Sequence, residues 1–353
     1  MGLRIGTKMV TRDGVPLVMA EIGVNHDGDV GKGLKLVEAA AEAGCDAVKF
    51  QLFSARLLVS RDAQLVAYQK RSGEKSADEM LSSLEMPAEK MGVLVKRAKE
   101  LGMAAVVTPF SAELVADCVG MGVDGIKLAS PDLVNRPLME AAARTGLPVI
   151  VSTGAAELAE IERSVGWLWK WGAGERAVIL HCVSSYPTPA EKATLGAISV
   201  LRGRFLEMPV GYSDHTVETE TAALAVACGA CFLEKHLTLD RTAKGPDHAA
   251  SLEAAGMAEY VRQAKLGFAM RGAFEKVVQD TERGVREQTR QSVVTREDLK
   301  AGTVLTREML TVKRPGTGVP AAEMERVIGK QLMRDVGADR VVHWGDVEGG
   351  GAA

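Results

Sequence analysis

The feature that most constrains this chain is a repeated alternation of short apolar runs with segments of helical spacing. Eight such units follow one another between Leu17 and Arg271. The apolar runs are nearly continuous, which is typical of strands buried on both faces of a parallel sheet. Eight strand–helix units over about 250 residues predict a (β/α)8 barrel, the α/β architecture also known as a TIM barrel.

An open, doubly wound sheet is the alternative arrangement of the same units. Its usual sign is a G-x-G-x-x-G turn after the first strand, and this chain reads GVNHDG there, from Gly23 to Gly28. We therefore favour the closed barrel.

The spacing also predicts individual elements. Asp13, Gly14 and Pro16 are turn residues that predict a short hairpin or loop before the first strand. Residues 52–84 form a polar excursion that is too long for an ordinary connection, so we expect a functional loop with its own helix. The predicted strands include 17–23 and 47–51, and the predicted helices are 29–44, 87–101, 111–120, 135–145, 157–171 and 252–271.

The chain divides into a large and a small predicted domain. We expect the barrel over residues 1–277 and a linker over the polar, charged segment 278–291. Residues 292–348 carry short apolar runs and glycine-rich turns, which predict a β-rich domain. A domain of about 60 residues is only marginally stable alone. Residues 349–353 are expected to form a flexible tail.

Composition excludes several classes of partner. The formal net charge is -3 and the isoelectric point is near 6.1, so the chain lacks the basic field of a nucleic-acid-binding protein. No apolar run reaches the ~18 residues that span a bilayer, and the first residues lack the apolar core of a signal peptide. We expect a cytoplasmic protein with small-molecule substrates.

The five cysteines are scattered and odd in number, which favours a reducing compartment over a disulfide framework. Cys228 and Cys231 form a C-x-x-C pair in a turn of small residues. A zinc site would need two more ligands at the usual sequence spacing, and the sequence does not supply them. We favour buried, inert thiols over a redox pair.

Polar residues end two neighbouring apolar runs between Pro209 and His248. The carboxyl ends of parallel strands are where α/β enzymes place their chemistry. This stretch therefore predicts an active site at that end of the barrel. The residues are Ser213, Asp214 and His215 in the first run and Glu234, Lys235 and His236 in the second, and Asp247 follows in the next loop.

Polar residues at the ends of the other predicted strands meet at the same mouth. Lysines supply charge, serines supply directional donors, and Thr153 and Gly154 form a turn before a helix whose N–H groups suit an anion. This mixture predicts a phosphate site, although a single lysine at a strand end is more often a solvated rim charge. The predicted mouth residues are Glu21, Lys49, Gln51, Lys127, Ser130, Ser152, Tyr186, His215 and His236.

His215 and His236 end adjacent predicted strands and are candidate metal ligands. A lone histidine in a barrel is more often a hydrogen-bonded structural residue. Two imidazoles leave positions open for water and substrate, as Lewis-acid catalysis requires. Such an open, partly aqueous shell suits Mn²⁺ or Mg²⁺ better than structural zinc, so we expect one of these two ions as cofactor.

A series of motifs, in order along the chain, resembles the sialic acid synthases. The C-terminal part, with KRPGTG, resembles their SAF domain, which is similar to type III antifreeze protein. The resemblance covers about residues 10–348. The motifs are AEIGVNHDG, DAVKFQ, TPF, IKLAS, VSTG, LHCVSSYPTP, GYSDHT and LEKHLTLD, followed by GPDHAASLE.

The resemblance implies a transferase that condenses phosphoenolpyruvate with an open-chain 2-acetamido sugar of the mannosamine type. The product is a nine-carbon 3-deoxy-ulosonic acid, and phosphate leaves by C–O cleavage. The leading expectation is an N-acetylneuraminate synthase that acts on N-acetylmannosamine. Legionaminic and pseudaminic acid synthases, which use trideoxy-diacetamido-hexoses, share these motifs, and a 9-phosphate synthase that uses N-acetylmannosamine 6-phosphate is a further alternative.

The resemblance also implies residue roles. His215 and His236 match the metal ligands. Arg314, in KRPGTG, matches an arginine that reaches the sugar pocket of the neighbouring subunit, which implies a domain-swapped homodimer. The phosphoenolpyruvate side is matched by Lys49, Gln51, Lys127, Ser130, Ser152, Ser184 and Ser213, the sugar side by Tyr186, Asp247 and Arg314, and the catalytic residues by Glu21, Lys49, Asp132 and Tyr186.

Two positions depart from the family pattern. Ser130-Pro131-Asp132 stands where S-G-E is usual, so a backbone N–H is lost and the acid is one methylene shorter. Ser184 is an asparagine in some relatives. Both positions bear on the choice of acceptor.

Two further alternatives remain from the sequence. One is a condensation with a simple aldose phosphate, as in deoxy-heptulosonate and deoxy-octulosonate phosphate synthases. The SAF-like domain with Arg314 disfavours it. The other is a catalytically idle barrel with an ice-binding-like domain, which the retained lysines and histidines disfavour.

Overall fold

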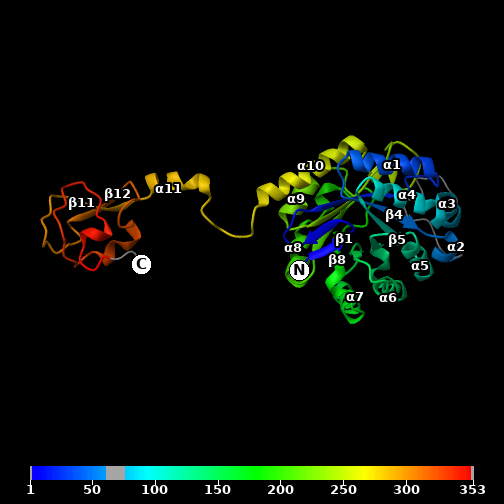
Figure 1. The fold of residues 1–353 in the computed structure, drawn as a ribbon, viewed down its shortest axis with the longest axis horizontal. Coiled ribbons are helices and arrows are strands. Elements are labelled where there is room, and N and C mark those ends of the chain that lie inside the picture. The colour runs from blue at the N-terminus through cyan, green and yellow to red at the C-terminus, as the bar shows by residue number, and fades with distance from the viewer. Residues whose placement is uncertain (1, 61–75, 351–353) are drawn as a thin grey trace. The chain divides into compact units, whose positions relative to one another are not determined.

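The computed structural model describes residues 2–60 and 76–350, and the chain forms two compact units, Met1–Ala273 and Phe274–Ala353. The first unit contains a closed barrel of parallel strands in the order β10-β3-β4-β5-β6-β7-β8-β9 (Figure 1). This confirms the predicted barrel over the open sheet. The strands are β3 Leu17–Gly23, β4 Ala47–Leu52, β5 Ala104–Pro109, β6 Gly125–Leu128, β7 Val149–Ser152, β8 Ala177–Cys182, β9 Val210–Asp214 and β10 Phe232–His236.

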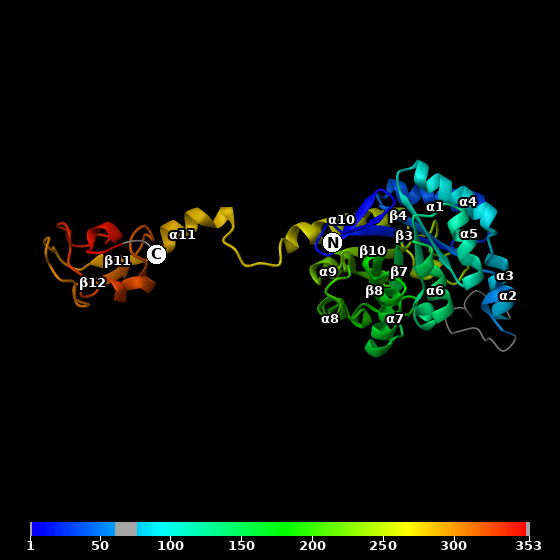
Figure 2. The same ribbon diagram turned by 60° about the horizontal axis from the view of Figure 1, so that its bottom comes forward.

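Helices cover the outside of the barrel. Figure 2 shows two of them, α6 and α7, side by side against the strands. The predicted helices 87–101, 135–145 and 157–171 each extend one residue beyond the observed helix at either end. The helices are α1 Val30–Glu42, α4 Ala88–Glu100, α5 Val115–Gly120, α6 Arg136–Arg144, α7 Leu158–Lys170, α8 Gly196–Arg204, α9 Thr221–Ala227 and α10 Ala254–Arg271.

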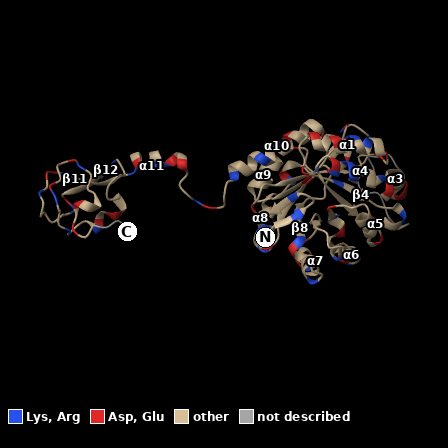
Figure 3. Ribbon diagram, viewed as in Figure 1, with Lys and Arg blue, Asp and Glu red and all other residues tan. Residues whose placement is uncertain are grey.

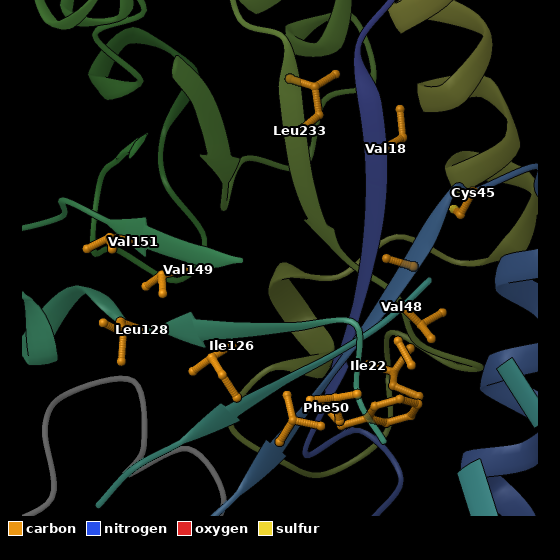
Figure 4. Close-up of a cluster of buried hydrophobic side chains, with 14 of the residues drawn as sticks. Val18, Ile22, Cys45, Val48, Phe50, Ile126, Leu128, Val149, Val151 and Leu233 are labelled. Atoms are coloured by element: carbon orange, nitrogen blue, oxygen red, sulfur yellow. The ribbon is translucent and has the colours of Figure 1, made fainter. Parts of the chain in front are cut away.

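Successive side chains of each strand point to opposite sides of the barrel wall. Outward-facing residues such as Val18, Val48 and Ile126 pack against the helices (Figure 4). Inward-facing residues such as Met19 and Ile150 belong to a second apolar cluster inside the barrel. Full burial of each large apolar side chain contributes about 1.5–3 kcal/mol, so both faces of every strand have to be apolar until the chain reaches the mouth.

A small hairpin closes the amino-terminal end of the barrel, as the turn residues near Gly14 suggested. Strands β1, Gly2–Ile5, and β2, Lys8–Thr11, pair antiparallel. Leu3, Ile5 and Val10 of the hairpin pack into the same inner cluster as the first residues of the barrel strands. The carboxyl end of the barrel is therefore the end left open for a ligand.

The long excursion after β4 carries the helix expected there. Helices α2, Ala55–Leu58, and α3, Ala77–Leu84, lie on either side of residues 61–75, which are outside the described residues. Ser76 caps α3 by accepting a hydrogen bond from the Glu79 amide at 3.1 Å.

The second unit is built on β11, Ser292–Thr295, which pairs antiparallel with β12, Leu310–Lys313. It has its own apolar core, which includes Val293 and Leu332. The segment expected as a linker, 278–291, is exposed throughout but contains helix α11, Arg283–Thr289. Polar composition predicts the exposure but not the helix, which follows a local capping arrangement between Gln279 and Glu282.

Acidic and basic side chains are interspersed on both units (Figure 3). Within residues 2–60 and 76–350, no helix is long and apolar enough to cross a membrane.

Candidate active site

A cavity of about 340 Å³ lies at the carboxyl end of the barrel strands, within the range of about 300–1,000 Å³ that is usual for ligand sites. One side of it is polar and brings together most of the residues predicted from the sequence. The polar lining consists of Lys49, Gln51, Lys127, Ser130, Asp132, Ser152, Tyr186, Ser213, His215, Glu234, His236 and Asp247.

The two-residue period of the strands explains this convergence. On β10, for example, Phe232, Glu234 and His236 point inward, and Leu233 belongs to the outer core. The inner cluster thus changes from apolar to polar along the strand. Lys49 of β4 and Lys127 of β6 also point inward near the ends of their strands, and they form the floor of the cavity.

The floor is a network of buried charges. Lys49 Nζ lies 2.9 Å from Glu21 Oε2 and 3.1 Å from Glu234 Oε1, and Lys127 Nζ lies 3.4 Å from Glu234 Oε2. Ser213 Oγ donates to Glu234 Oε1 at 3.2 Å. Two ammonium groups, two carboxylates and a hydroxyl therefore compensate one another at the base of the site.

Sequence reasoning placed Glu234 in the polar cluster but gave it no role. Its position two residues before His236 was the available signal, because it puts both side chains on the same face of β10. Burial alone would raise the pKa of Glu234, but Lys127 and Lys49 lower it overall. Burial lowers the pKa of Lys49 to about 8, although Glu234 opposes this shift. Glu234 is thus the shared counter-charge of both lysines.

Glu21 does not line the cavity directly but supports it. Gln51 Nε2 donates to Glu21 Oε1 at 2.6 Å. Gly23 makes room for this pair, because a Cβ there would lie 2.2 Å from Glu21 Oε1 and 2.6 Å from Gln51 Nε2. Its φ of +33° accompanies a register shift in β3 that re-aims the strand end.

The hydroxyl groups gather at the ends of β6 and β7. Ser152 Oγ is buried and has no hydrogen-bond partner among the described residues, so it is available to a ligand. Ser130 Oγ accepts from the Gly154 amide at 3.0 Å. The Gly154 N–H group predicted to face an anion is therefore occupied by Ser130 here. Ser184 is exposed and does not line the cavity, but a Cβ at Gly154 would lie 2.2 Å from its Oγ.

His215 and His236 lie beside each other with their ring centroids 5.3 Å apart, and the Tyr186 ring is 4.1 Å from that of His215. His215 Nδ1 is 3.0 Å from the Val183 carbonyl oxygen. A protonated Nδ1 that donates to this carbonyl leaves Nε2 as the ligating atom, the usual arrangement of a metal-binding histidine. Burial holds the pKa of His236 well below its usual value, so its imidazole is neutral.

These two imidazoles fit an open metal shell rather than a closed one. His236 Nδ1 is buried without a hydrogen-bond partner among the described residues, and Asp247 Oδ2 is 3.6 Å away. Among residues 2–60 and 76–350, no group of three or more His, Cys, Asp or Glu side chains is arranged to hold a metal. The pair could therefore hold a divalent ion whose remaining positions go to water and substrate.

Two buried acids complete the polar side. Burial raises the pKa of Asp132 and of Asp247, although Asn135 opposes the shift for the first and His215 for the second. Asp132 Oδ1 accepts from Asn135 at 3.2 Å, while Oδ2 has no hydrogen-bond partner within the described residues. Both acids are suited to carry a proton near a substrate.

Another part of the cavity lining is apolar. Phe53 and Phe110 meet edge to face with centroids 6.0 Å apart, and Met80 and Leu84 of α3 pack with them. We call this side the apolar wall. It consists of Val24, Phe53, Leu58, Val59, Ala77, Met80, Leu81, Leu84 and Phe110.

Arg314 lies in the second unit, next to the end of β12, and is exposed. There it lines a separate cavity with Lys313, Arg340 and His343. Its predicted contact with a neighbouring subunit's sugar pocket stays a prediction.

Comparison with known proteins shows which family the chain belongs to. The NeuB family model matches residues 36–276, and the SAF domain model matches residues 290–348. The chain belongs to the NeuB family.

Other members resemble it over nearly their whole length. The N,N'-diacetyllegionaminic acid synthase of Legionella pneumophila is 35% identical, with 94% of each chain covered. The human N-acetylneuraminate-9-phosphate synthase is 32% identical over 92% of this chain and 90% of its own length. The sialic acid synthetase of Leptospira borgpetersenii, solved with citrate, has a TM-score of 0.74 and 32% identity over 81% of this chain and 95% of its own. This NeuB protein therefore belongs to the same family as these synthases of the sialic-acid type.

Proposed function

We propose that this protein catalyses a metal-dependent condensation of phosphoenolpyruvate with an open-chain 2-acetamido-aldose of the mannosamine type. One observation carries the proposal: the paired imidazoles of His215 and His236 face the same cavity as the buried lysines Lys49 and Lys127. A site for an aldehyde activator and a site for a phosphorylated acid thus line one cavity.

The lysines and serines hold the anionic substrate. Lys49 and Lys127 supply positive charge, and Ser130, Ser152 and Ser213 supply hydroxyl donors for the phosphate and carboxylate oxygens. These residues lie on rigid strand ends and so orient C3 of phosphoenolpyruvate toward the histidine pair. Holding the two reactants in fixed positions converts a bimolecular encounter into an effectively unimolecular step.

The histidine side receives the acceptor aldehyde. A divalent Mn²⁺ or Mg²⁺ ion held by His215 and His236 would supply Lewis acidity at the aldehyde oxygen. Asp247, beside His236, is placed to give a proton to that oxygen as it becomes a hydroxyl.

Attack of phosphoenolpyruvate C3 on the aldehyde carbon forms the new C–C bond and leaves C2 electron-deficient. Asp132, which lines the cavity, is the candidate for directing water to C2. Glu21 supports the cavity from behind through Lys49 and Gln51. The C2–O bond then breaks, and phosphate leaves with its bridging oxygen.

Turnover tests the proposal directly. Protein, Mn²⁺, phosphoenolpyruvate and N-acetylmannosamine are incubated, and free phosphate and 3-deoxy-ulosonate are measured. Formation of N-acetylneuraminate is the expected result. Lack of turnover with this acceptor and with trideoxy-diacetamido-hexoses would refute the proposal.

A legionaminic-type acceptor is the second candidate, and the apolar wall favours it. A 6-deoxy sugar with two acetamido groups presents methyl groups where N-acetylmannosamine 6-phosphate presents a dianion. Apart from Lys49 and Lys127, which are paired with Glu21 and Glu234, no lysine or arginine among the described residues lines the cavity. A phosphorylated acceptor would therefore lack a free cation on this part of the barrel.

A panel of N-acetylmannosamine, N-acetylmannosamine 6-phosphate and 2,4-diacetamido-2,4,6-trideoxymannose separates these candidates, because the acceptor with the highest kcat/KM identifies the class. The kcat/KM for 2,4-diacetamido-2,4,6-trideoxymannose is expected to exceed that for N-acetylmannosamine 6-phosphate. Replacement of Phe110 by serine should reduce the preference, because it exposes a hydroxyl to the methyl groups. A preference for the phosphorylated sugar would contradict the role of the apolar wall.

A further inference from the structure

Two charged residues that the proposed chemistry does not use lie behind the histidine pair, on the outer side of the barrel wall. Asp214 ends β9, and Lys235 is the residue before the end of β10. They are register partners, and Lys235 Nζ lies 3.0 Å from Asp214 Oδ2. Neither side chain has any exposed surface. This is a fully buried ion pair between adjacent strands.

The pair is coupled to the histidines by the alternation of strand side chains. Asp214 immediately precedes His215, and Lys235 immediately precedes His236. The residues of the pair point outward and the histidines point into the cavity. Each charged residue shares a peptide unit with a histidine. A shift of either strand end would therefore move the charged residue and its neighbouring histidine together.

The same two side chains hold the turn that follows His215. Lys235 Nζ donates to the Thr216 carbonyl at 2.7 Å, to Thr216 Oγ1 at 3.2 Å and to the Glu218 carbonyl at 3.3 Å. Asp214 accepts from the Thr216 amide at 2.8 Å and from Thr221 Oγ1 at 2.5 Å. The backbone on both sides of His215 is therefore fixed to the end of β10.

Stability alone does not account for a pair of this kind. Desolvation of two buried charges offsets much of their attraction, and well-packed apolar residues of the same volume are often at least as stable. A fully satisfied network of directional hydrogen bonds instead defines one arrangement of the backbone that it holds.

We propose that Asp214 and Lys235 are positioning residues that set the separation and orientation of His215 and His236 for the metal ion. The inference rests on the proposed function, because it assigns the metal to these histidines. It predicts that disturbing the outer network weakens metal binding even though no metal ligand has changed.

Mn²⁺ titration followed by electron paramagnetic resonance tests this without any turnover. The Asp214→Asn/Lys235→Met double variant removes both charges and leaves neither one unpaired, and its Kd for Mn²⁺ should be about 10- to 100-fold weaker. Thr216→Val removes one hydroxyl from the network with little change in volume, and should weaken the Kd by about 10-fold, the lower end of the range for groups that orient metal ligands. Thr216→Ser keeps the hydroxyl and should bind as the wild type does.

Met139→Ala in α6 is the control for general destabilisation, because Met139 is fully buried outside the network. It should lower the Tm and leave the Kd for Mn²⁺ unchanged. A wild-type Kd in Thr216→Val would overturn the proposal, as would an equal weakening in Met139→Ala. If the double variant does not fold, the comparison of Thr216→Val with Thr216→Ser decides. Failure of the wild type itself to bind Mn²⁺ would instead refute the proposed metal site.

Discussion

The ammonium group of Lys49 lies 3.1 Å from the carboxylate of Glu234, and both side chains are buried in the floor of the cavity. Lys127 approaches the other oxygen of the same carboxylate. The two cations that suit phosphoenolpyruvate thus share one counter-charge before any substrate arrives. A bound anion would supply part of the negative charge that Glu234 supplies in the free protein. The stability of the cavity floor should therefore depend on the charge of the substrate.

Replacement of Glu234 by glutamine should destabilise the free protein and increase its response to phosphoenolpyruvate. The change leaves two buried ammonium groups with less compensation, which costs about 3–5 kcal/mol for a broken buried pair. Denaturant unfolding measures the loss, and the rise in Tm on adding phosphoenolpyruvate should be larger than in the wild type. Glu162→Gln, which breaks an exposed pair with Arg204, should cost at most about 1 kcal/mol. Equal effects of the two changes would argue against this account.

Affinity for phosphoenolpyruvate should fall as the pH rises above about 8, the pKa to which burial lowers Lys49. Lysine is charged below its pKa, so the cationic floor is complete at pH 7 and loses a charge at pH 9. The Kd should rise by up to about tenfold per pH unit in this range, if only the charged form binds. Calorimetric titration from pH 7 to 9.5 measures it. Lys49→Met should bind weakly at every pH, and a steep rise that survives in this variant would point to another group.

Replacement of either histidine by alanine should weaken Mn²⁺ binding and turnover together. Loss of one imidazole from a two-histidine site is expected to cost at least the ~10–100-fold typical of disturbed metal sites. His343→Ala, in the second unit, is the matched control and should change neither quantity. Variants of His215 or His236 that bind metal and turn over normally would show that the ligands lie elsewhere.

A mixture of two inactive variants can test the domain-swapped dimer. In such a dimer, His236→Ala and Arg314→Ala would complement each other, because one of the two sites in a mixed dimer combines an intact barrel with an intact SAF domain. Co-refolded at equal amounts, they should recover about a quarter of wild-type activity if pairing is random. Lack of recovery, with mixed dimers shown to form, would place Arg314 at its own barrel or outside the site.

The barrel and its mouth were predictable from the sequence because both depend on the two-residue alternation of side chains along a strand. Strands buried on both faces have to be apolar throughout, so the inward polar residues Lys49, Lys127 and Ser152 mark the open end. The same parity could have assigned Glu234 to the cavity and Lys235 to the outer face. As sequence neighbours, Glu234 and Lys235 look like members of one polar cluster, and only the alternation of side chains separates their roles.

Other features depend on distances that the sequence does not encode locally. The apolar wall joins Phe53, Phe110 and α3 from separate connections, and apolar residues in loops carry no periodic signal. The contact of Gly154 with Ser130 depends on how two strand ends meet. Arg314 belongs to another compact unit, so its relation to the mouth follows only from family resemblance.

The most direct test of the central claim follows one oxygen atom. Phosphoenolpyruvate labelled with ¹⁸O in the bridge between C2 and phosphorus is incubated with the protein, Mn²⁺ and the acceptor that the panel selects. Condensation at C3 with C–O cleavage predicts that the label leaves with phosphate, together with a nine-carbon 3-deoxy-ulosonic acid seen by mass spectrometry. Unlabelled phosphate, or phosphate release without that acid, would contradict the account.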